Sequence, residues 1–511
     1  MSEDEAMRNH GIGSWPARQA RKVPQRIALR AGERVITYAE LHERVTRLAH
    51  GLRAIGAAAG DRVAYLGPNH PAFLETFFAT GTIGAVFVPL NTRLAAAELE
   101  ANLADAGATV LVHGREHAVM AEELGQGRSV VGPSRFDQLI EGASNEPIDH
   151  PVTPDDPCLI MFTSGTTGRA KGAVLSHANI TWNSLNVLVD ADLLSDEVTL
   201  LVAPLFHTAG LNMTCLPTLL KGGQVVLEPT FEPDRVLELI ERHRITFMFA
   251  VPPMYDAIAR SPRWPTADLS SLRTLTCGGA PVPLSTIRTY QERGLAFIQG
   301  YGMTEASPGV LLLDRAQSVT KAGSAGVPHF FTDVRIVRPD LVDCRPGEAG
   351  EVLVGGPNVM RGYWNRPDET SAAFTPDGVW FRSGDVAVSD VDGYVTVVDR
   401  IKDMIISGGE NVYPAEVEQA LADHPAVAAA AVIGVPDERW GEVGRAFVIL
   451  RTDSTVDDVP VDGEALREFL VGRIANYKIP KTVQIVTDLP RNAVGKILRS
   501  RLRDLSAEGP S

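Results

Sequence analysis

Short apolar runs alternate with longer amphipathic runs over most of the chain, and this alternation constrains the fold most strongly. An apolar run at 62–66 precedes a probable helix over 71–82. Another at 85–90 precedes a helical run over 95–106, and a further apolar run follows at 109–112. The same rhythm returns between 224 and 298. Strands that alternate with helices in this way predict mostly parallel sheets covered by helices.

The texture of the sequence changes after about residue 323. Short strand-like runs and Gly/Asp turns dominate 334–399 and predict a small antiparallel, barrel-like part. From about residue 403 a helix (414–423), two apolar strands (429–433 and 446–450) and a helix (463–474) predict a separate α+β domain. A chain of 511 residues is too long for one core. We therefore expect an N-terminal domain over 1–401 and a smaller C-terminal domain over 402–511.

Composition narrows the function classes. The formal net charge of −15 argues against a protein that binds nucleic acid through bulk positive charge. The four cysteines are widely spaced, which favours reduced thiols over metal ligands. The acidic N-terminus has no apolar signal segment, and the most apolar window, 77–90, is too short to span a bilayer. We expect a cytoplasmic protein without a membrane span; its oligomeric state, monomer or homodimer, stays open.

A run rich in Gly, Ser and Thr follows an apolar strand at 158–162. It reads Thr163-Ser164-Gly165-Thr166-Thr167-Gly168-Arg169-Ala170-Lys171-Gly172. Such a loop presents backbone N–H groups and hydroxyls to a polyphosphate, and Lys171 adds positive charge. It lacks the Gly-Lys-Ser/Thr spacing of a P-loop and no helix pattern follows it, which predicts a phosphate cradle of another kind. A flexible surface turn is the alternative.

Three further segments carry chemistry, although each is weak alone. Gln299-Gly300-Tyr301-Gly302-Met303-Thr304-Glu305 offers an aromatic ring to a purine and a carboxylate to Mg²⁺. Asp385 and Arg400 have the chemistry to hold ribose hydroxyls, or form only an exposed ion pair. The turn 490–498 presents Lys496, which alone would be solvated surface.

Taken together and in this order, the segments resemble the acyl-adenylate-forming superfamily, the AMP-binding acyl- and aryl-CoA ligases. The resemblance runs from residue 36 to Lys496 and includes 204–207, 278–281 and 477–481. The stretch 405–414 resembles CoA ligases rather than luciferases. Among those ligases the chain is similar to actinobacterial feruloyl-CoA synthetases, as seen at 13–16, 64–71 and 323–328.

The resemblance implies a two-step reaction with ATP, Mg²⁺ and coenzyme A. A carboxylic acid and ATP give acyl-AMP and pyrophosphate, and a thiol then displaces AMP. Because no carrier domain follows the C-terminal domain, free CoA is the expected thiol rather than a carrier protein. The catalytic residues implied are Lys496, His207, Thr304 and Glu305, and the metal ligands implied are Thr163 and Glu305.

The resemblance also implies three binding regions. The residues implied for ATP or AMP are Thr163, Ser164, Gly165, Thr166, Thr167, Gly168, Lys171, Gly279, Ala280, Pro281, Gly300, Tyr301, Gly302, Met303, Thr304, Asp385, Val397 and Arg400. Those implied for CoA are Lys402, Ser407, Gly408, Gly409, Glu410 and Trp440. Those implied for the acyl pocket are His207, Thr208, Gly210, Asn212, Val251, Met254, Gly278, Gly302 and Pro308. Lys402 falls at the hinge about which the mobile C-terminal domain rotates between the two steps.

The acid itself is the least constrained part of this interpretation. Similarity to feruloyl-CoA synthetases implies an aromatic acid of the hydroxycinnamate type. Thr208 and Asn212 have the chemistry to bond ring substituents, and Gly210 leaves space for a flat ring edge. Alternatively these residues bond only to the protein and the substrate is a fatty or polycyclic acid. An enzyme that only transfers a preformed acyl-adenylate to CoA and a non-enzymatic nucleotide-binding regulator are further alternatives.

Overall fold

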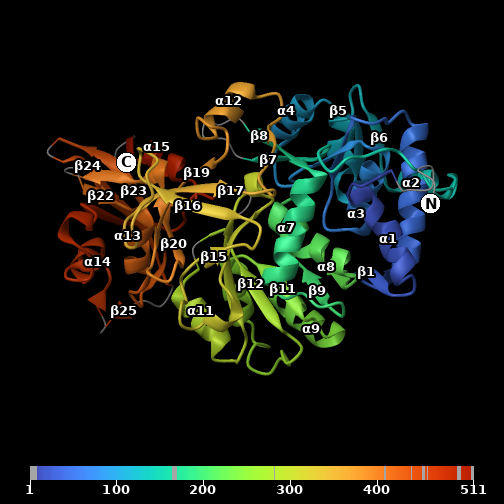
Figure 1. The fold of residues 1–511 in the computed structure, drawn as a ribbon. Coiled ribbons are helices and arrows are strands. Elements are labelled where there is room, and N and C mark those ends of the chain that lie inside the picture. Colours follow the sequence, from blue (N-terminus) through green and yellow to red (C-terminus); the bar gives the residue numbers. More distant parts are fainter. Residues whose placement is uncertain are drawn as a thin grey trace. The chain divides into compact units, whose positions relative to one another are not determined.

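The computed structural model describes residues 8–163, 170–280, 282–407, 410–438, 440–451, 455–456, 459–491 and 497–507. Its contacts divide the chain into two compact units. The first comprises Met1–Val334 and Val354–Phe381, and the second comprises Arg335–Leu353 and Arg382–Ser511. Figure 1 shows the elements of both. The expected boundary between residues 401 and 402 separates the C-terminal domain that is predicted to rotate, and this boundary stays a proposal.

A seven-stranded sheet carries the predicted phosphate loop in the first unit. Its spatial order is β18 (Gly362–Tyr363), β8 (Lys171–Ser176), β7 (Pro157–Thr163), β4 (Val86–Pro89), β3 (Arg62–Leu66), β5 (Ala108–His113) and β6 (Ser129–Val131). The five neighbouring strands β7, β4, β3, β5 and β6 run parallel. β8 runs antiparallel to β7, and β18 runs antiparallel to β8. The loop after β7 therefore connects two strands, which confirms that no helix follows it.

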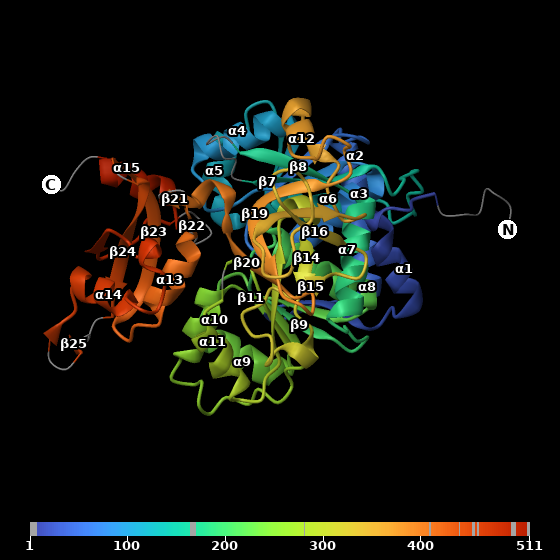
Figure 2. The ribbon, with the colours of Figure 1, turned by 60° about the vertical axis from the view of Figure 1, so that its left-hand side comes forward.

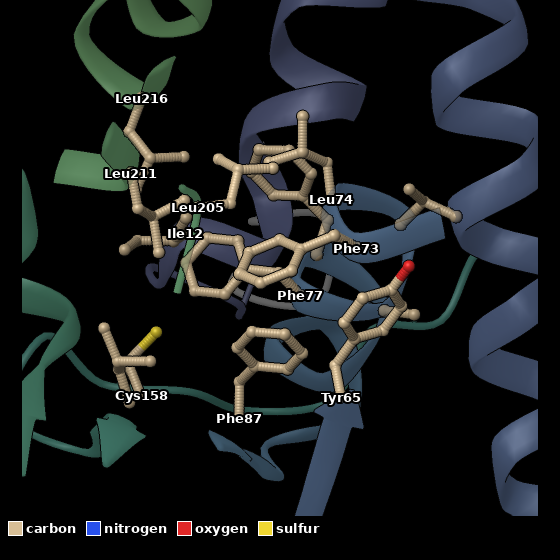
Figure 3. Packing of buried hydrophobic residues seen from close by; sticks show 14 of the residues in the cluster. Ile12, Tyr65, Phe73, Leu74, Phe77, Phe87, Cys158, Leu205, Leu211 and Leu216 are labelled. Atoms are coloured by element: carbon tan, nitrogen blue, oxygen red, sulfur yellow. The ribbon is translucent and has the colours of Figure 1, made fainter. Parts of the chain in front are cut away.

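Both faces of this sheet are buried, which explains its nearly continuous apolar strands. Val63 and Tyr65 of β3 join one core cluster, and their neighbours Ala64 and Leu66 join another. Aromatic rings from α3 (Pro71–Ile83) fill the first cluster, where Phe73 lies 5.1 Å from Tyr65 and 5.0 Å from Phe87 between ring centroids. Figure 3 shows these rings stacked edge to face.

A nine-stranded sheet forms the other half of the first unit. Its order is β15 (Val327–Pro328), β14 (Gly309–Leu312), β13 (Phe297–Gly302), β12 (Thr274–Cys277), β11 (Phe247–Ala250), β9 (Val198–Leu201), β10 (Gln224–Leu227), β1 (Ile27–Ala31) and β2 (Arg34–Thr37). The strands from β13 to β1 are parallel. The carboxyl ends of β11, β12 and β13 therefore meet at one edge, where three of the predicted site segments begin.

The helices of the first unit begin with recognisable local signals. The Thr37 side chain caps α2 by accepting a hydrogen bond from the Glu40 N–H, and Ser176 and Asn179 form a capping box at α7. The helices are α1 (Trp15–Lys22), α2 (Tyr38–Ala54), α3, α4 (Ala96–Ala106), α5 (Ala118–Glu123), α6 (Pro133–Glu141), α7 (His177–Asp190), α8 (Leu216–Lys221), α9 (Pro233–His243), α10 (Pro252–Ala259), α11 (Leu284–Gln291) and α12 (Pro367–Ala372). The helices expected over 71–82 and 95–106 are confirmed.

The second unit contains two larger sheets. The short strands expected between 334 and 399 form a four-stranded sheet in the order β16 (Asp333–Val337), β17 (Gly350–Gly355), β19 (Phe381–Ser389) and β20 (Val395–Arg400). The C-terminal sheet has the order β22 (Glu410–Val412), β21 (Ile405–Ser407), β24 (Gly441–Leu450) and β23 (Val427–Asp437), with β27 (Thr482–Ile485) pairing with β24. A small pair, β25 (Thr455–Val456) and β26 (Val459–Pro460), completes the strands.

The C-terminal sheet has a core on each face. Val432 of β23 packs with Val417 of α13 (Pro414–Ala422) and Leu466 of α14 (Gly463–Leu470). The alternate residues Ala431 and Ile433 pack instead with Leu502 of α15 (Arg499–Ala507). Figure 2 shows α13 and α14 along this sheet. A sheet buried on both sides gives this part of the chain its own core, as the α+β expectation required.

One helix is shorter than predicted. The helix expected over 463–474 ends at Leu470, because Gly472 has a left-handed φ of +75° and the chain turns there, with a bridge between Val471 and Ile474. The amphipathic pattern over 471–474 therefore belongs to the turn after α14. Among the helices of the described residues, none is long and apolar enough to cross a membrane.

Candidate active site

The ends of the predicted phosphate loop lie together in the first unit. Thr163 ends β7 and pairs across the hairpin with Lys171, which begins β8. Thr163 Oγ1 lies 3.5 Å from Glu305 Oε1, although the two residues are far apart in the sequence. Lys171 Nζ lies 3.5 Å from a carboxylate oxygen of Glu369 and 5.2 Å from the ring centroid of Tyr363. The structure thus brings Thr163, Lys171 and Glu305 to one place.

Tyr363 is a part of this site that the sequence analysis missed. β18 pairs with β8 and places the Tyr363 hydroxyl 2.9 Å from Glu305 Oε1. Burial and the neighbouring Glu305 carboxylate raise the pKa of Tyr363, so its hydroxyl stays protonated and donates this bond. The Met360 N–H also donates to the Glu305 carbonyl oxygen at 2.7 Å. No local motif marks residues 360–363, because only the strand pairing brings them here.

Glycines occur where neighbouring strand ends of the nine-stranded sheet approach closely. A Cβ at Gly278 would lie 2.8 Å from the Gly300 carbonyl oxygen, and a Cβ at Gly302 would collide with the Pro308 carbonyl. Gly279 has a left-handed φ of +83°, which favours glycine independently of any ligand. The parallel pairing of β11, β12 and β13 therefore places Gly278, Ala280 and residues 300–302 at the same edge of the nine-stranded sheet. Val251, which follows β11 and precedes α10, lies at this edge too.

The predicted acyl-pocket segment folds as a π-helical turn, η4 (Ala209–Cys215), that leads into α8. Gly210 is required for a different reason from the predicted one: a Cβ there would lie 2.5 Å from the Pro204 carbonyl oxygen. Asn212 is fully buried, and its Nδ2 donates a 3.0 Å hydrogen bond to Thr208 Oγ1. The other amide atom, Asn212 Oδ1, has no hydrogen-bond partner among the described residues. One polar acceptor in this wall is therefore left unsatisfied.

His207 immediately precedes this turn. Burial, with a smaller contribution from the positive charge of Arg93, lowers the pKa of His207 to about 4. His207 is therefore neutral at physiological pH. Within the described part of the chain its Nε2 atom is buried and lacks a hydrogen-bond partner. A neutral imidazole with an unused nitrogen is able to exchange a hydrogen bond with a substrate.

Two buried asparagines hold the segments of the acyl region together, and the sequence analysis missed both. Asn183 of α7 donates to the Asn212 carbonyl oxygen and accepts from the Gly309 N–H, at 2.8 and 2.9 Å. Asn358 donates to the carbonyl oxygens of Ala306 and Gly309, both at 2.8 Å. Because these side chains bond to backbone, they fix the 306–309 segment that contains Pro308. No chemical motif distinguishes them from ordinary polar residues.

In the second unit, strand pairing joins the two residues predicted for ribose. Asp385 of β19 lies opposite Arg400 of β20, and Arg400 Nε lies 2.9 Å from Asp385 Oδ1. The Asp385 side chain is 7% exposed and that of Arg400 is 41% exposed. Val397 lies on the same strand as Arg400 and pairs with Ala387. The predicted pair therefore exists, with a buried acceptor and a half-exposed cation.

The segment that contains the predicted hinge is held by charge pairs from the second unit. Asp399 Oδ2 accepts from the Ala415 N–H at 2.8 Å, and Asp403 lies 3.1 Å from Arg503 Nη2 and 3.5 Å from Arg499 Nη1 of α15. Glu418 accepts two hydrogen bonds from Arg499. Lys402 lies between Asp399 and Asp403, in the turn Ile401–Asp403. The chain on both sides of Lys402 is therefore anchored.

The predicted CoA-binding segment approaches Trp440 through sheet pairing. Ser407 of β21 pairs with Glu410 of β22 on one side and with Gly441 of β24 on the other. Trp440 directly precedes Gly441 and is 47% exposed. Because Ser407 pairs with Gly441, it lies near Trp440, and the indole of Trp440 stays accessible. Several predicted site residues lie outside the described residues: Ser164–Gly168, Pro281, Gly408, Gly409 and Lys496. Arg491 and Ile497, which flank residues 492–496, form an antiparallel bridge.

The fold and these segments agree with a known enzyme family. The family model of the AMP-binding enzyme matches residues 16–364, and that of the AMP-binding enzyme C-terminal domain matches residues 416–496. The chain therefore belongs to the AMP-binding enzyme family, and within it to the acid–CoA ligases.

Individual relatives resemble the chain over nearly its whole length. Feruloyl-CoA synthases from Amycolatopsis sp and Streptomyces sp are each 58% identical to it over 497 residues, which cover 97% of this chain and 99% of theirs. Among solved structures, the o-succinylbenzoate coenzyme A synthetase of Bacillus subtilis in complex with ATP and magnesium ion is similar, with a TM-score of 0.87 and 34% identity. That match covers 96% of this chain and 99% of the other.

Proposed function

We propose that this chain is a cytoplasmic ATP- and Mg²⁺-dependent ligase that joins an aromatic acid of the hydroxycinnamate type, such as ferulate, to coenzyme A. In the first step the carboxylate attacks the α-phosphate of ATP, and pyrophosphate leaves. In the second step the CoA thiolate attacks the acyl carbonyl, and AMP leaves. The whole-chain similarity to feruloyl-CoA synthases supports this substrate class.

The residues around Glu305 fit a magnesium ion. Mg²⁺ prefers oxygen ligands and is usually held by one or two carboxylates together with substrate phosphates. The Glu305 carboxylate and the Thr163 hydroxyl supply such oxygens within 3.5 Å of each other. The described residues contain no cluster of three or more metal-ligating side chains, which agrees with a metal held mostly by phosphate. Bound there, the ion would neutralise charge on the phosphates.

The chain's own residues take the remaining roles in this proposal. The 163–171 loop and Lys171 bind the β- and γ-phosphates, and Thr304 contacts the α-phosphate. Gly279 to Pro281 and Gly300 to Met303 line the adenine region, while Asp385, Val397 and Arg400 surround the ribose. Lys496 neutralises the acid and the α-phosphate in the first step.

The second step uses the other face of the C-terminal domain. Rotation about Lys402 withdraws Lys496 and brings the CoA-binding residues to a pantetheine tunnel. Those residues are Ser407, Gly408, Gly409, Glu410 and Trp440. The neutral His207 lies between the tunnel and the acyl pocket, and Val251, Met254 and Pro308 form apolar parts of that pocket.

The unsatisfied Asn212 Oδ1 atom is the observation that carries the substrate class. Because Asn212 Nδ2 is already bonded to Thr208, the free oxygen requires a donor from elsewhere. The phenolic hydroxyl of a hydroxycinnamate is such a donor, whereas a fatty acyl chain offers none. Leaving a buried acceptor unpaired costs about 1–3 kcal/mol, which corresponds to roughly tenfold or more in discrimination.

Kinetics on a matched series of acids tests this proposal. We expect kcat/KM to be about tenfold or more higher for ferulate and p-coumarate than for cinnamate, which lacks the hydroxyl, and for octanoate. Asn212→Leu should abolish the difference between p-coumarate and cinnamate, while Asn186→Leu in α7 serves as a control for general damage. Equal use of cinnamate and p-coumarate by the unaltered enzyme would remove the assignment of Asn212. A higher kcat/KM for octanoate or a polycyclic acid would remove the substrate class.

The half-reactions are tested separately. ATP–pyrophosphate exchange that depends on ferulate is expected, followed by feruloyl-CoA formation when CoA is added. Absence of exchange with every acid, together with thioester formation from synthetic feruloyl-AMP, would instead identify an enzyme that performs only the transfer step.

A further inference from the structure

A cavity of about 280 Å³ opens in the first unit. It lies at the carboxyl ends of β3 and β5 and is lined by residues that follow directly from them, including Pro68 after β3 and His113 at the end of β5. The starts of α3 and α6 contribute Ala72 and Phe136. The cavity shares no lining residue with the proposed catalytic site.

The strand order gives this position a particular meaning. From β3 the chain crosses to β4 on one side, and from β4 it returns to β5 on the other side of β3. The connections therefore diverge between β3 and β5, and helices leave these two strands in opposite directions along the sheet. In open parallel sheets such a switch point leaves a crevice outside the carboxyl ends of the strands, where ligands bind. The cavity occupies that crevice.

Part of the cavity wall is apolar. Tyr65, Val112 and Phe136 line it, and all three belong to the core cluster behind it. A volume of 280 Å³ lies near the lower end of the range of about 300–1,000 Å³ that is usual for small-molecule sites. The space suits a compact ligand with a planar apolar body.

A tyrosine side chain with a hydroxyl group lines this wall. Tyr65 lines the cavity and is 1% exposed. Figure 3 shows the Tyr65 oxygen at the end of the ring that is turned away from Phe87. Burial raises the pKa of Tyr65, so this group remains a donor. Such a hydroxyl is able to donate a hydrogen bond to a ligand in the cavity.

The charged side chains around the cavity also favour a ligand that accepts hydrogen bonds. The buried Glu75 carboxylate is already neutralised by two hydrogen bonds from Arg44, at 2.6 and 3.2 Å. Arg34 Nη2 is 3.9 Å from Glu75, too far for a hydrogen bond. Arg34, which pairs only loosely with Glu75, and Arg115 add further donors on exposed side chains.

The remaining groups at the cavity are solvent-facing acids and a helix end. Glu116 and Asp137 are exposed, where water screens their charge. α6 begins at Pro133, which lines the cavity, and its N-cap residue Gly132 provides no side-chain cap. The unsatisfied N–H groups of that first turn favour negative charge nearby.

We propose that this cavity is a second ligand site, which binds a compact organic carboxylate with a flat apolar body. The carboxylate accepts hydrogen bonds from Tyr65, Arg34 and Arg115, and the apolar body lies on Val112 and Phe136. This site is separate from the acyl pocket, so an aromatic acid of substrate size is able to occupy both at once.

Fluorine NMR with 4-fluorocinnamate tests the proposal on the full chain. The catalytic site is first filled with the sulfamoyl analogue of feruloyl-AMP, and native mass spectrometry establishes that one analogue is bound. We expect 4-fluorocinnamate to bind this saturated protein at one further site. Arg34→Gln combined with Arg115→Gln removes the cations, and Ala72→Leu fills the cavity without changing charge. Each should weaken this binding at least tenfold.

Control variants and competitors decide the outcome. Arg21→Gln combined with Arg53→Gln removes two exposed arginines elsewhere in the first unit and should leave the binding unchanged. Thermal unfolding establishes that all variants are folded. The proposal is overturned if the saturated wild-type protein does not bind 4-fluorocinnamate, or if both cavity variants bind it as tightly as the wild type. Displacement of 4-fluorocinnamate by equimolar inorganic phosphate overturns the assignment of a carboxylate.

Discussion

The Tyr363 hydroxyl donates a hydrogen bond of 2.9 Å to Glu305 Oε1, the same carboxylate oxygen that lies 3.5 Å from Thr163 Oγ1. Three elements thus meet at one oxygen: the end of β7, the turn after β13 and the short strand β18. Tyr363 therefore orients the Glu305 carboxylate, to which we assign Mg²⁺, without itself being one of the proposed metal ligands. Residues that support a ligand in this way commonly affect metal affinity by about 10–100-fold.

The first prediction concerns this support. Tyr363→Phe should raise the Mg²⁺ concentration for half-maximal ATP–pyrophosphate exchange by about tenfold, because the Glu305 carboxylate loses its orienting donor. Glu305→Gln should raise it further. Tyr477→Phe, which removes an exposed phenol from the second unit, is the control. If Tyr363→Phe lowers the maximal rate but leaves the Mg²⁺ dependence unchanged, Tyr363 does not act through the metal site.

A second prediction separates binding from stability at the Asp385–Arg400 pair. Because Arg400 is 41% exposed, its ion pair should contribute less than about 1 kcal/mol to folding. Arg400→Gln should therefore barely change the free energy of unfolding but raise the KM for ATP by about five- to tenfold. Arg382→Gln breaks an ion pair with Glu351 from an equally exposed arginine in the same sheet and should leave this KM unchanged. Equal KM values in the two variants would exclude the ribose role of Arg400.

The third prediction concerns Lys496. Lys496→Ala should lower adenylation by about 10²–10⁴-fold, because it removes positive charge from the reacting phosphate. Transfer from synthetic feruloyl-AMP to CoA should survive, since we propose that the lysine is withdrawn in that step. Lys481→Ala, which breaks a surface pair with Asp437, controls for loss of charge in the same domain. Equal loss of both half-reactions would contradict the two-conformation proposal.

The hinge gives a fourth prediction. Lys402→Pro restricts φ to about −65° and should hinder rotation between the two steps. Pyrophosphate exchange should persist while the rate of thioester formation falls. A normal thioester rate with normal exchange would show that this backbone position does not turn.

The fifth prediction is a pH dependence of stability. His177 Nδ1 accepts a 3.1 Å hydrogen bond from the Ile12 N–H, and burial lowers the pKa of His177 to about 4. Because the folded pKa lies below the unfolded value of 6.5, the stabilisation is present at neutral pH and is lost as the pH falls from 6.5 towards 4. From these values His177 alone should account for a loss of about 2 kcal/mol between pH 8 and pH 5.

Urea unfolding of His177→Asn at both pH values measures this loss. The asparagine oxygen is expected to accept the Ile12 bond without titrating, so the difference between the two pH values should shrink by about 2 kcal/mol. His50→Asn serves as the control. An undiminished difference in His177→Asn would assign the acid sensitivity to other groups.

Local sequence patterns predicted those strands, helices and turns that depend on neighbouring residues alone. The strand at 62–66, the helix that begins at Pro71 and the lack of a helix directly after the phosphate loop all follow from apolar periodicity and turn residues. Gly472 ended α14 early because a single left-handed residue outweighs an amphipathic pattern. Tyr363, Asn183 and Asn358 escaped prediction because their roles depend on strand pairing and on buried hydrogen bonds between distant segments. The cavity at β3 and β5 likewise arises from strand order, which no local motif records.

The close approach of the backbone at Gly210, Gly278 and Gly302 limits how the proposed acyl pocket is redesigned or diversified. A side chain at any of the three would meet a carbonyl group of the protein before it met a substrate. Libraries that vary these positions to change acid preference would therefore force the backbone to shift. The useful variation is confined to side chains that already project from the framework, at Thr208, Asn212 and Met254.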